Sequence, residues 1–191
     1  MSGYSRGITV EEYVRIIDYL PQGIPSGSYS KKEPVCFGIG EEEFKLFELV
    51  PKANAKIHMG DRVYVGEDRV LRTQIDHIRR RVGYTELTNT AQTELDYAVE
   101  EVVASNPKRF IRFYNEAIPI SMRKHMLEEL PGLGKKSMEA LIKERSKEKF
   151  KDFEDLSVRV PVVKNPEKLI SARIILEISD SGLKRYIFVA R

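Results

Sequence analysis

Short apolar stretches separated by turn residues occupy the first third of the chain. Residues 12–20, 35–40, 44–50 and 62–65 are rich in β-branched and aromatic side chains, and Gly, Pro or acidic residues bound them. Such a series is typical of β-strands joined by tight turns. It predicts a small barrel or sandwich, with a short helix over residues 12–20 as the alternative for the first segment.

The spacing of apolar residues becomes helical after Tyr84. Thr90 can cap a first helix. The apolar face of that helix is formed by Leu95, Val99, Val102 and Val103. Asn106 followed by Pro107 is typical of a helix start and predicts a second helix to about Ala117. Residues 121–130, 134–147 and 152–160 are three further predicted helices.

The end of the chain returns to strand-like patterns. Residues 171–178 and 183–189 are apolar and flank the turn sequence Ser-Asp-Ser-Gly at 179–182. An isolated pair of strands is marginal in water, so we expect this hairpin to close the N-terminal barrel. The predicted fold class is α+β. A small OB-like β-barrel of residues 1–83 and 168–191 would receive an inserted helical domain of residues 84–167.

Composition excludes several classes of protein. The 191 residues are 41% hydrophobic, carry a net charge of only +3 and contain one cysteine. A core is therefore expected, whereas an internal disulfide or a cysteine-based zinc site is not. No apolar run approaches the roughly 20 residues that cross a bilayer, and the first residues lack a secretory signal. We expect a cytoplasmic protein without a membrane partner.

The strongest local motif is Leu-Pro-Gly-Leu-Gly-Lys-Lys at residues 130–136. Gly132 and Gly134 permit a sharp turn and a close approach of the backbone to a ligand, and Leu133 can plug the gap between two helices. The helix that follows begins with unpaired N–H groups, which favour an anion such as phosphate. Lys135 and Lys136 add positive charge at the same end.

This motif resembles the helix-hairpin-helix family of nucleic-acid-binding motifs over residues 121–147. The resemblance implies that Gly132, Leu133, Gly134, Lys135 and Lys136 contact a sugar-phosphate backbone. Met138 stands where the family usually has a small residue. The alternative is a plain αα-hairpin with a glycine turn and no ligand.

One such hairpin touches few phosphates, so a second surface is expected to contribute. The first candidate is the arginine cluster Arg79, Arg80 and Arg81, for which internal salt bridges are an equally good interpretation. The second candidate is Lys31 and Lys32, in a loop rich in Gly and Ser.

The sequence lacks the usual signatures of catalysis. His58, His77 and His125 are far apart, and there is no phosphate loop or nucleophile elbow. Cys36 lies in an apolar strand and is expected in the core. Lys136 could serve as the Schiff-base lysine of a glycosylase or lyase, but no acid follows in the Pro-rich stretch until Glu167. We expect no catalytic residue, metal or cofactor.

Over almost its whole length the chain also resembles an uncharacterised archaeal family, domain of unknown function 655. The resemblance rests on residues 17–23, on residues 86–91 and on the hairpin followed by residues 150–156. It implies a barrel with a helix-hairpin-helix, nucleic-acid binding, and genes that lie beside those of ribosomal and rRNA-modifying proteins.

The expected function is backbone-directed RNA binding in translation or ribosome assembly. RNA is favoured over DNA because a hairpin reads phosphates alone, whereas small barrels accept unstacked bases. A DNA-repair or replication accessory is the first alternative. A protein-interaction module, with the C-terminal strands as its edge, is the second, and a ribosomal or other protein partner is left open.

Overall fold

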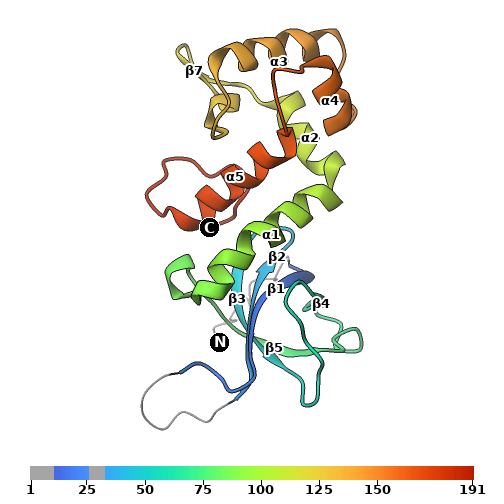
Figure 1. The fold of residues 1–191 in the computed structure, drawn as a ribbon, viewed down its shortest axis with the longest axis vertical. Helices are drawn as coiled ribbons and strands as arrows, with labels where there is room; N and C mark the ends of the chain where they lie inside the picture. The colour runs from blue at the N-terminus through green and yellow to red at the C-terminus, as the bar shows by residue number, and fades with distance from the viewer. Residues whose placement is uncertain (1–10, 26–32) are drawn as a thin grey trace, which may run out of the picture. The chain divides into compact units, whose positions relative to one another are not determined.

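The structure is a computed structural model that describes residues 11–25 and 33–191 (Figure 1). The chain divides into two compact units, one of residues 1–98 with 181–191 and the other of residues 99–180. Helix α1 (Asn89–Ser105) runs through the first boundary between the units, and helix α5 (Pro166–Ser179) ends just before the second. Within the described ranges, no helix is long and apolar enough to cross a membrane.

The first unit is built on an antiparallel five-stranded sheet that curls into a half-barrel (Figure 1). Its strand order is β4-β1-β2-β3-β5. The strands are β1 (Tyr13–Leu20), β2 (Val35–Gly40), β3 (Leu46–Pro51), β4 (Arg62–Tyr64) and β5 (Ile75–Arg81). The first four confirm the predicted segments. The prediction missed β5 because arginines replace the apolar residues that would mark a strand.

The half-barrel encloses an apolar core. A β-bulge between Ile16 and Asp18 interrupts the alternation of β1, so that both Ile16 and Ile17 are buried. Cys36 is also buried, and this burial raises the pKa of its thiol to about 12. The prediction that Cys36 is a core residue is therefore confirmed. The core cluster comprises Val14, Ile16, Cys36, Phe47, Leu49, Ile57, Val63, Val65 and Ile75.

The acidic turn between β2 and β3 is held by a buried carboxylate. Glu11 accepts hydrogen bonds from the N–H groups of Glu42 and Glu43, each at 2.7 Å. Gly40 lies beside this carboxylate, and a Cβ there would stand 2.1 Å from the Glu11 Cδ. Gly40 is thus required by the packing of this turn.

Helix α1 is capped by Thr88, two residues before the predicted cap Thr90. The Thr88 hydroxyl accepts the Ala91 N–H at 3.0 Å and donates to the Asp18 carboxylate at 2.5 Å. A single side chain therefore begins α1 and joins it to β1. A short 3-10 helix, η1 (Tyr84–Glu86), precedes it.

The predicted C-terminal hairpin is wrong. Residues 166–179 form helix α5, whose buried positions Pro166, Ile170 and Ile174 are spaced four residues apart. A short apolar run fits a strand or a buried helix equally well, and here the Pro166 start and the helical spacing decide for the helix. Residues 181–191 return to the first unit without forming a strand, and the Ala190 N–H donates to the Glu43 carbonyl at 3.1 Å.

Two predictions change with this helix. The C-terminal hairpin does not close the barrel, because the sheet already ends at the edge strands β4 and β5. The protein-interaction alternative expected an open strand edge at residues 171–178. These residues belong to helix α5 and form no strand edge.

The second unit contains the end of α1, helix α5, and a block of helices with a small ribbon. The predicted helices at 107–117, 134–147 and 152–160 are confirmed. They are α2 (Pro107–Glu116), α3 (Lys135–Lys147) and α4 (Phe153–Arg159). Buried polar contacts tie them together: the Tyr114 hydroxyl donates to the Pro166 carbonyl at 2.7 Å, and Asn115 bonds both the N–H and the carbonyl of Phe150 at 2.8 Å.

The predicted helix at residues 121–130 is wrong. That segment is a ribbon of β6 (Pro119–Ser121) and β7 (Lys124–His125), followed by the 3-10 turn η2 (Met126–Glu129). Two local hydrogen bonds start the turn at Met126: the His125 Nδ1 accepts the Leu127 N–H, and the Glu128 carboxylate accepts the His125 N–H. These side chains cap a turn where helix propensity alone would extend a helix. The first helix that the helix-hairpin-helix resemblance implies is therefore not formed, and η2 lies before the glycine turn in its place.

Candidate nucleic-acid interface

The glycine turn that precedes α3 has the geometry that its residues predict. Gly132 has φ of +85°, a conformation that side-chain-bearing residues rarely adopt. Leu133 is buried, with 8% of its surface exposed, and its N–H donates to the Leu130 carbonyl at 3.2 Å. Leu133 therefore anchors the turn in the core and is not available to a ligand.

The first turn of α3 presents free backbone donors. Gly134 is the N-cap residue, and its carbonyl accepts the Met138 N–H at 3.0 Å. Within the described residues, the N–H groups of Gly134, Lys135 and Lys136 have no acceptor. The side chains of both lysines are exposed and make no ion pair with that part of the chain. Backbone dipoles and two cations thus point at the same region.

Gly134 is not required by the packing of the protein. Its φ of −79° and ψ of 167° are open to any residue. A Cβ at this position would meet nothing within 4 Å. The absence of a side chain at Gly134 therefore leaves space on the outside of the molecule, in front of the free N–H groups.

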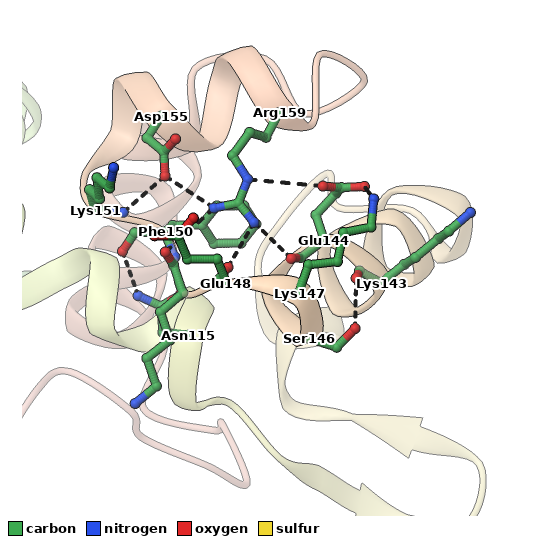
Figure 2. Close-up of polar contacts among 11 residues, drawn as sticks. Asn115, Lys143, Glu144, Ser146, Lys147, Glu148, Phe150, Lys151, Asp155 and Arg159 are labelled. Atoms are coloured by element: carbon green, nitrogen blue, oxygen red, sulfur yellow. Dashed lines mark hydrogen bonds and ion pairs between the residues drawn. The ribbon is translucent and has the colours of Figure 1, made fainter.

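The opposite end of α3 is fastened by Arg159, as Figure 2 shows. Its guanidinium donates to the carbonyls of Glu144 and Glu148, each at 2.7 Å, and to the Asp155 carboxylate at 3.2 Å. It also lies over the Phe150 ring, 4.6 Å from the ring centre. One end of α3 is thus tied to α4 by Arg159, whereas the other end makes no such contact among the described residues.

A groove of about 470 Å³ lies between the ribbon and the start of α3. Arg123 and Met122 form the tip of the ribbon, and Met122 is fully exposed. Lys124 is held by the Glu129 carboxylate at 2.7 Å, whereas the Arg123 side chain has no ion pair with a described residue. The groove is lined by Pro119, Ser121, Met122, Arg123, Lys124, His125, Glu128, Lys135 and Met138.

His125 contributes a donor to this groove. It is buried, and burial together with the nearby Arg145 guanidinium holds the pKa of its imidazole below the ordinary value. In the neutral ring Nδ1 accepts the Leu127 N–H, so the proton is on Nε2. His125 lines the groove, and within the described residues its Nε2 has no hydrogen-bond partner.

Arg123 and His125 were missed from the sequence as site residues, because a helix over residues 121–130 would have placed them elsewhere. The sequence signal that could have indicated a binding site here is the pair Arg123-Lys124 between Pro119 and Pro131. The ribbon, and not a first helix, brings these side chains to the start of α3.

The arginine cluster of β5 is engaged within the first unit. Arg79 and Arg80 both donate to the Glu48 carboxylate, at 2.8 and 2.9 Å, and Arg80 also donates to Glu86 at 2.6 Å. Arg81 donates to the Ala190 carbonyl at 3.0 Å. A phosphate would have to compete with these acceptors. Lys31 and Lys32 lie outside the described residues.

The histidines do not gather at a metal centre in the described part of the chain. No group of three or more His, Cys, Asp or Glu residues there could hold a metal ion. His58 is next to Asp61, and His77 is next to Asp76, each on a separate part of the first unit.

The sequence and the fold of this chain are similar to those of known proteins. Residues 10–190 match the family described as "Protein of unknown function (DUF655)", and the chain belongs to that family. It is 44% identical over 180 residues to Uncharacterized protein MJ0038 of Methanocaldococcus jannaschii, covering 94% of this chain and 80% of that protein. It is also similar to the crystal structure of Af1531 from Archaeoglobus fulgidus, with a TM-score of 0.87, 38% identity, and coverage of 94% of this chain and all of that one.

Proposed function

We propose that the protein binds the sugar-phosphate backbone of a nucleic acid at the start of α3. The proposal rests on the free N–H groups of Gly134, Lys135 and Lys136. These groups lie beside a groove that is lined by exposed cations. A helix start with unpaired donors suits a phosphate, and neighbouring lysines strengthen the attraction. The binding requires no catalysis.

Gly134 supports a close approach by a ligand. Neither the backbone angles of Gly134 nor its surroundings exclude a side chain. The role of the glycine is therefore to leave room for a phosphate, which a larger side chain would block. A phosphate oxygen that accepts hydrogen bonds from the N–H groups of residues 134–136 must come within about 3 Å of them. A Cβ with further branches at Gly134 would occupy that space.

The neighbouring groove favours a strand over a single anion. Arg123 extends from the ribbon and Lys135 from α3, so cations line the groove from both sides. The Nε2–H of His125 adds a neutral donor between them. Consecutive phosphates of one backbone can use these groups together, whereas one small anion cannot.

RNA with unpaired bases is the nucleic acid that this groove suits best. Met122, fully exposed at the ribbon tip, offers an apolar surface beside the cations. An unstacked base can pack against such a side chain, and single-stranded loops of RNA supply unstacked bases. With the genes that the family resemblance implies as neighbours, the proposed setting is ribosome assembly or translation.

The test compares two variants at the start of α3 with a control pair beyond its other end. Gly134→Val should fold normally and bind a labelled stem-loop RNA at least about tenfold more weakly, because the side chain blocks the phosphate. Lys135→Ala with Lys136→Ala should flatten the slope of log affinity against log salt by about one to two. The matched control is Lys149→Ala with Lys151→Ala, which removes two exposed lysines beyond the other end of the helix.

Anisotropy titrations across a range of salt concentrations measure both effects. If the control pair lowers the affinity as much as Lys135→Ala with Lys136→Ala does, RNA is attracted by the general positive charge of the unit and not by the start of α3. Unchanged RNA affinity in folded Gly134→Val would remove the start of α3 from the binding site.

A further inference from the structure

A second basic pocket lies on the first unit, at the end of the β3–β5 ladder. Its volume is about 290 Å³, and it is lined by Lys52, Arg69, Arg72, Asp76 and His77. None of these residues takes part in the groove beside α3. The residues come from three places in the sequence, namely the end of β3, the loop before β5, and β5 itself.

Backbone contacts bring these segments together. The Lys52 N–H donates to the Gln74 carbonyl at 2.8 Å, and Pro51 lies opposite Ile75 in the ladder. Lys52 therefore stands directly beside the beginning of β5. Strand pairing therefore places Lys52 beside Asp76 and His77, and the exposed turn before β5 contributes Arg69.

Arg72 is fixed in place by carbonyl groups. Its Nε donates to the Gly66 carbonyl at 2.6 Å, and its Nη1 donates to the Asp76 carbonyl at 3.2 Å. These neutral acceptors orient the guanidinium without neutralising its charge. The remaining N–H donors and the full positive charge of Arg72 are thus available in the pocket.

The only carboxylate of the pocket is engaged with a histidine. The Asp76 Oδ2 lies 2.6 Å from the His77 Nδ1, and this hydrogen bond holds the pKa of the Asp76 carboxyl below its usual value. No ion pair joins this carboxylate to an arginine or to Lys52 within the described residues, although the charges of Lys52 and Arg72 also lower its pKa. Neither Lys52 nor Arg69 forms an ion pair with any described residue.

Other cations of the same unit face carboxylates. Arg15 and Arg62 both pair with Glu41, at 2.8 and 2.9 Å, and Arg79 and Arg80 both pair with Glu48. The pocket gathers three cations around one acid that is already bonded. Their mutual repulsion is relieved by an anion, and a tetrahedral anion with several acceptor oxygens can use donors from different directions.

We propose that the pocket of Lys52, Arg69, Arg72 and His77 binds a phosphate group. The guanidiniums of Arg69 and Arg72 and the ammonium of Lys52 balance the negative charge of the phosphate. His77, hydrogen-bonded to Asp76, lines the remaining side of the pocket. The ligand class is a phosphate ester, either a monoester on a small molecule or a diester within a nucleic-acid strand. This site is independent of the groove beside α3.

The experiment uses the full chain, with inorganic phosphate, uridine 5′-monophosphate and a short single-stranded RNA as three probes. The variant is Lys52→Gln with Arg69→Gln, both exposed and unpaired, so its melting temperature should match that of the unchanged protein. The control is Lys56→Gln with Lys184→Gln, which removes two exposed charges of the same unit outside the pocket. Calorimetry measures affinity, and the His77 ring resonances report occupancy directly.

We expect uridine 5′-monophosphate to shift the His77 resonances, with an affinity at least about tenfold lower in the pocket variant and unchanged in the control. The same result for inorganic phosphate identifies a monoester site. Dependence on the pocket with the RNA probe alone identifies a diester site. Gly134→Val separates this site from the proposed function, because it should leave the His77 shifts intact. Unmoved His77 resonances with all three probes, or equal affinities of the pocket variant and the control, would overturn the proposal.

Discussion

The Arg159 Nη2 donates to the Glu144 carbonyl at 2.7 Å and so joins α4 to the last turn of α3 (Figure 2). Arg159→Ala should lower the free energy of unfolding by about 2–4 kcal/mol, because several charged hydrogen bonds and the contact with Phe150 are lost together. Chemical denaturation measures the change. The control is Arg112→Ala, whose pair with Glu116 is exposed and should contribute about 0.5 kcal/mol or less. Similar losses in both variants would mean that Arg159 does not hold α3.

The two glycines Gly40 and Gly134 should respond oppositely to alanine. Gly40→Ala places a Cβ against the buried Glu11 carboxylate and should cost about 1–3 kcal/mol of stability. Gly134→Ala fills open space and should leave the melting temperature nearly unchanged. Thermal melts of the two variants check this pair. A destabilised Gly134→Ala would contradict the view that Gly134 is kept open for a ligand.

Acid should weaken the second unit through His125. The pKa of its imidazole is lowered from 6.5 by burial and by Arg145, so the unfolded chain binds a proton at higher pH than the folded chain. The stability present above pH 6.5 should therefore be lost as the pH falls from 6.5 toward the folded pKa. His125→Asn keeps an acceptor near the Leu127 N–H and cannot titrate. Denaturation at several pH values should show a flatter profile for this variant, and identical profiles would contradict the assignment.

Met122 should select unpaired bases. Met122→Ser removes the apolar tip of the ribbon and keeps every cation of the groove, so it should weaken binding of a stem-loop RNA and spare duplex DNA. Competition between the two nucleic acids at matched salt measures the preference. A stem-loop RNA that is displaced as well by duplex DNA of equal length would contradict the RNA assignment and favour a DNA accessory.

The protein should not cut nucleic acid. Lys136 is exposed and has no carboxylate paired with it among the described residues, whereas a Schiff-base lysine works with a nearby base in a desolvated site. Incubation with RNA or DNA and Mg²⁺ or Mn²⁺ should give no cleavage. Borohydride trapping on abasic-site DNA, lost in Lys136→Ala, would show a lyase.

Much of the fold could be predicted because its signals are local. Short runs of β-branched and aromatic residues between turn residues marked β1 to β4, and caps with helical spacing marked α2, α3 and α4. The turn at Gly132 was equally readable, since positive φ and the free donors of the next helix depend on a few consecutive residues. The start of α3 as a candidate anion site therefore follows from residues 130–136 alone.

Other features depend on residues that are distant in the sequence. The apolar run of α5 became a helix that buries Arg173 against Glu177 and, 44 residues away, against Glu129. Residues 119–125 form a ribbon, and the turn after it is held by the burial of Leu127 and Leu130 in the core as well as by its local caps.

Tertiary structure also decides which cations are available to a ligand. Arg79 and Arg80 are adjacent to each other, but their charges are met by Glu48, 31 and 32 residues away, across the β3–β5 ladder. Arg69 and Lys52 are just as basic in sequence and form no ion pair with a described residue, although Asp76 lines the same pocket. A charge pattern states where cations occur, whereas long-range pairing decides which of them a phosphate can reach.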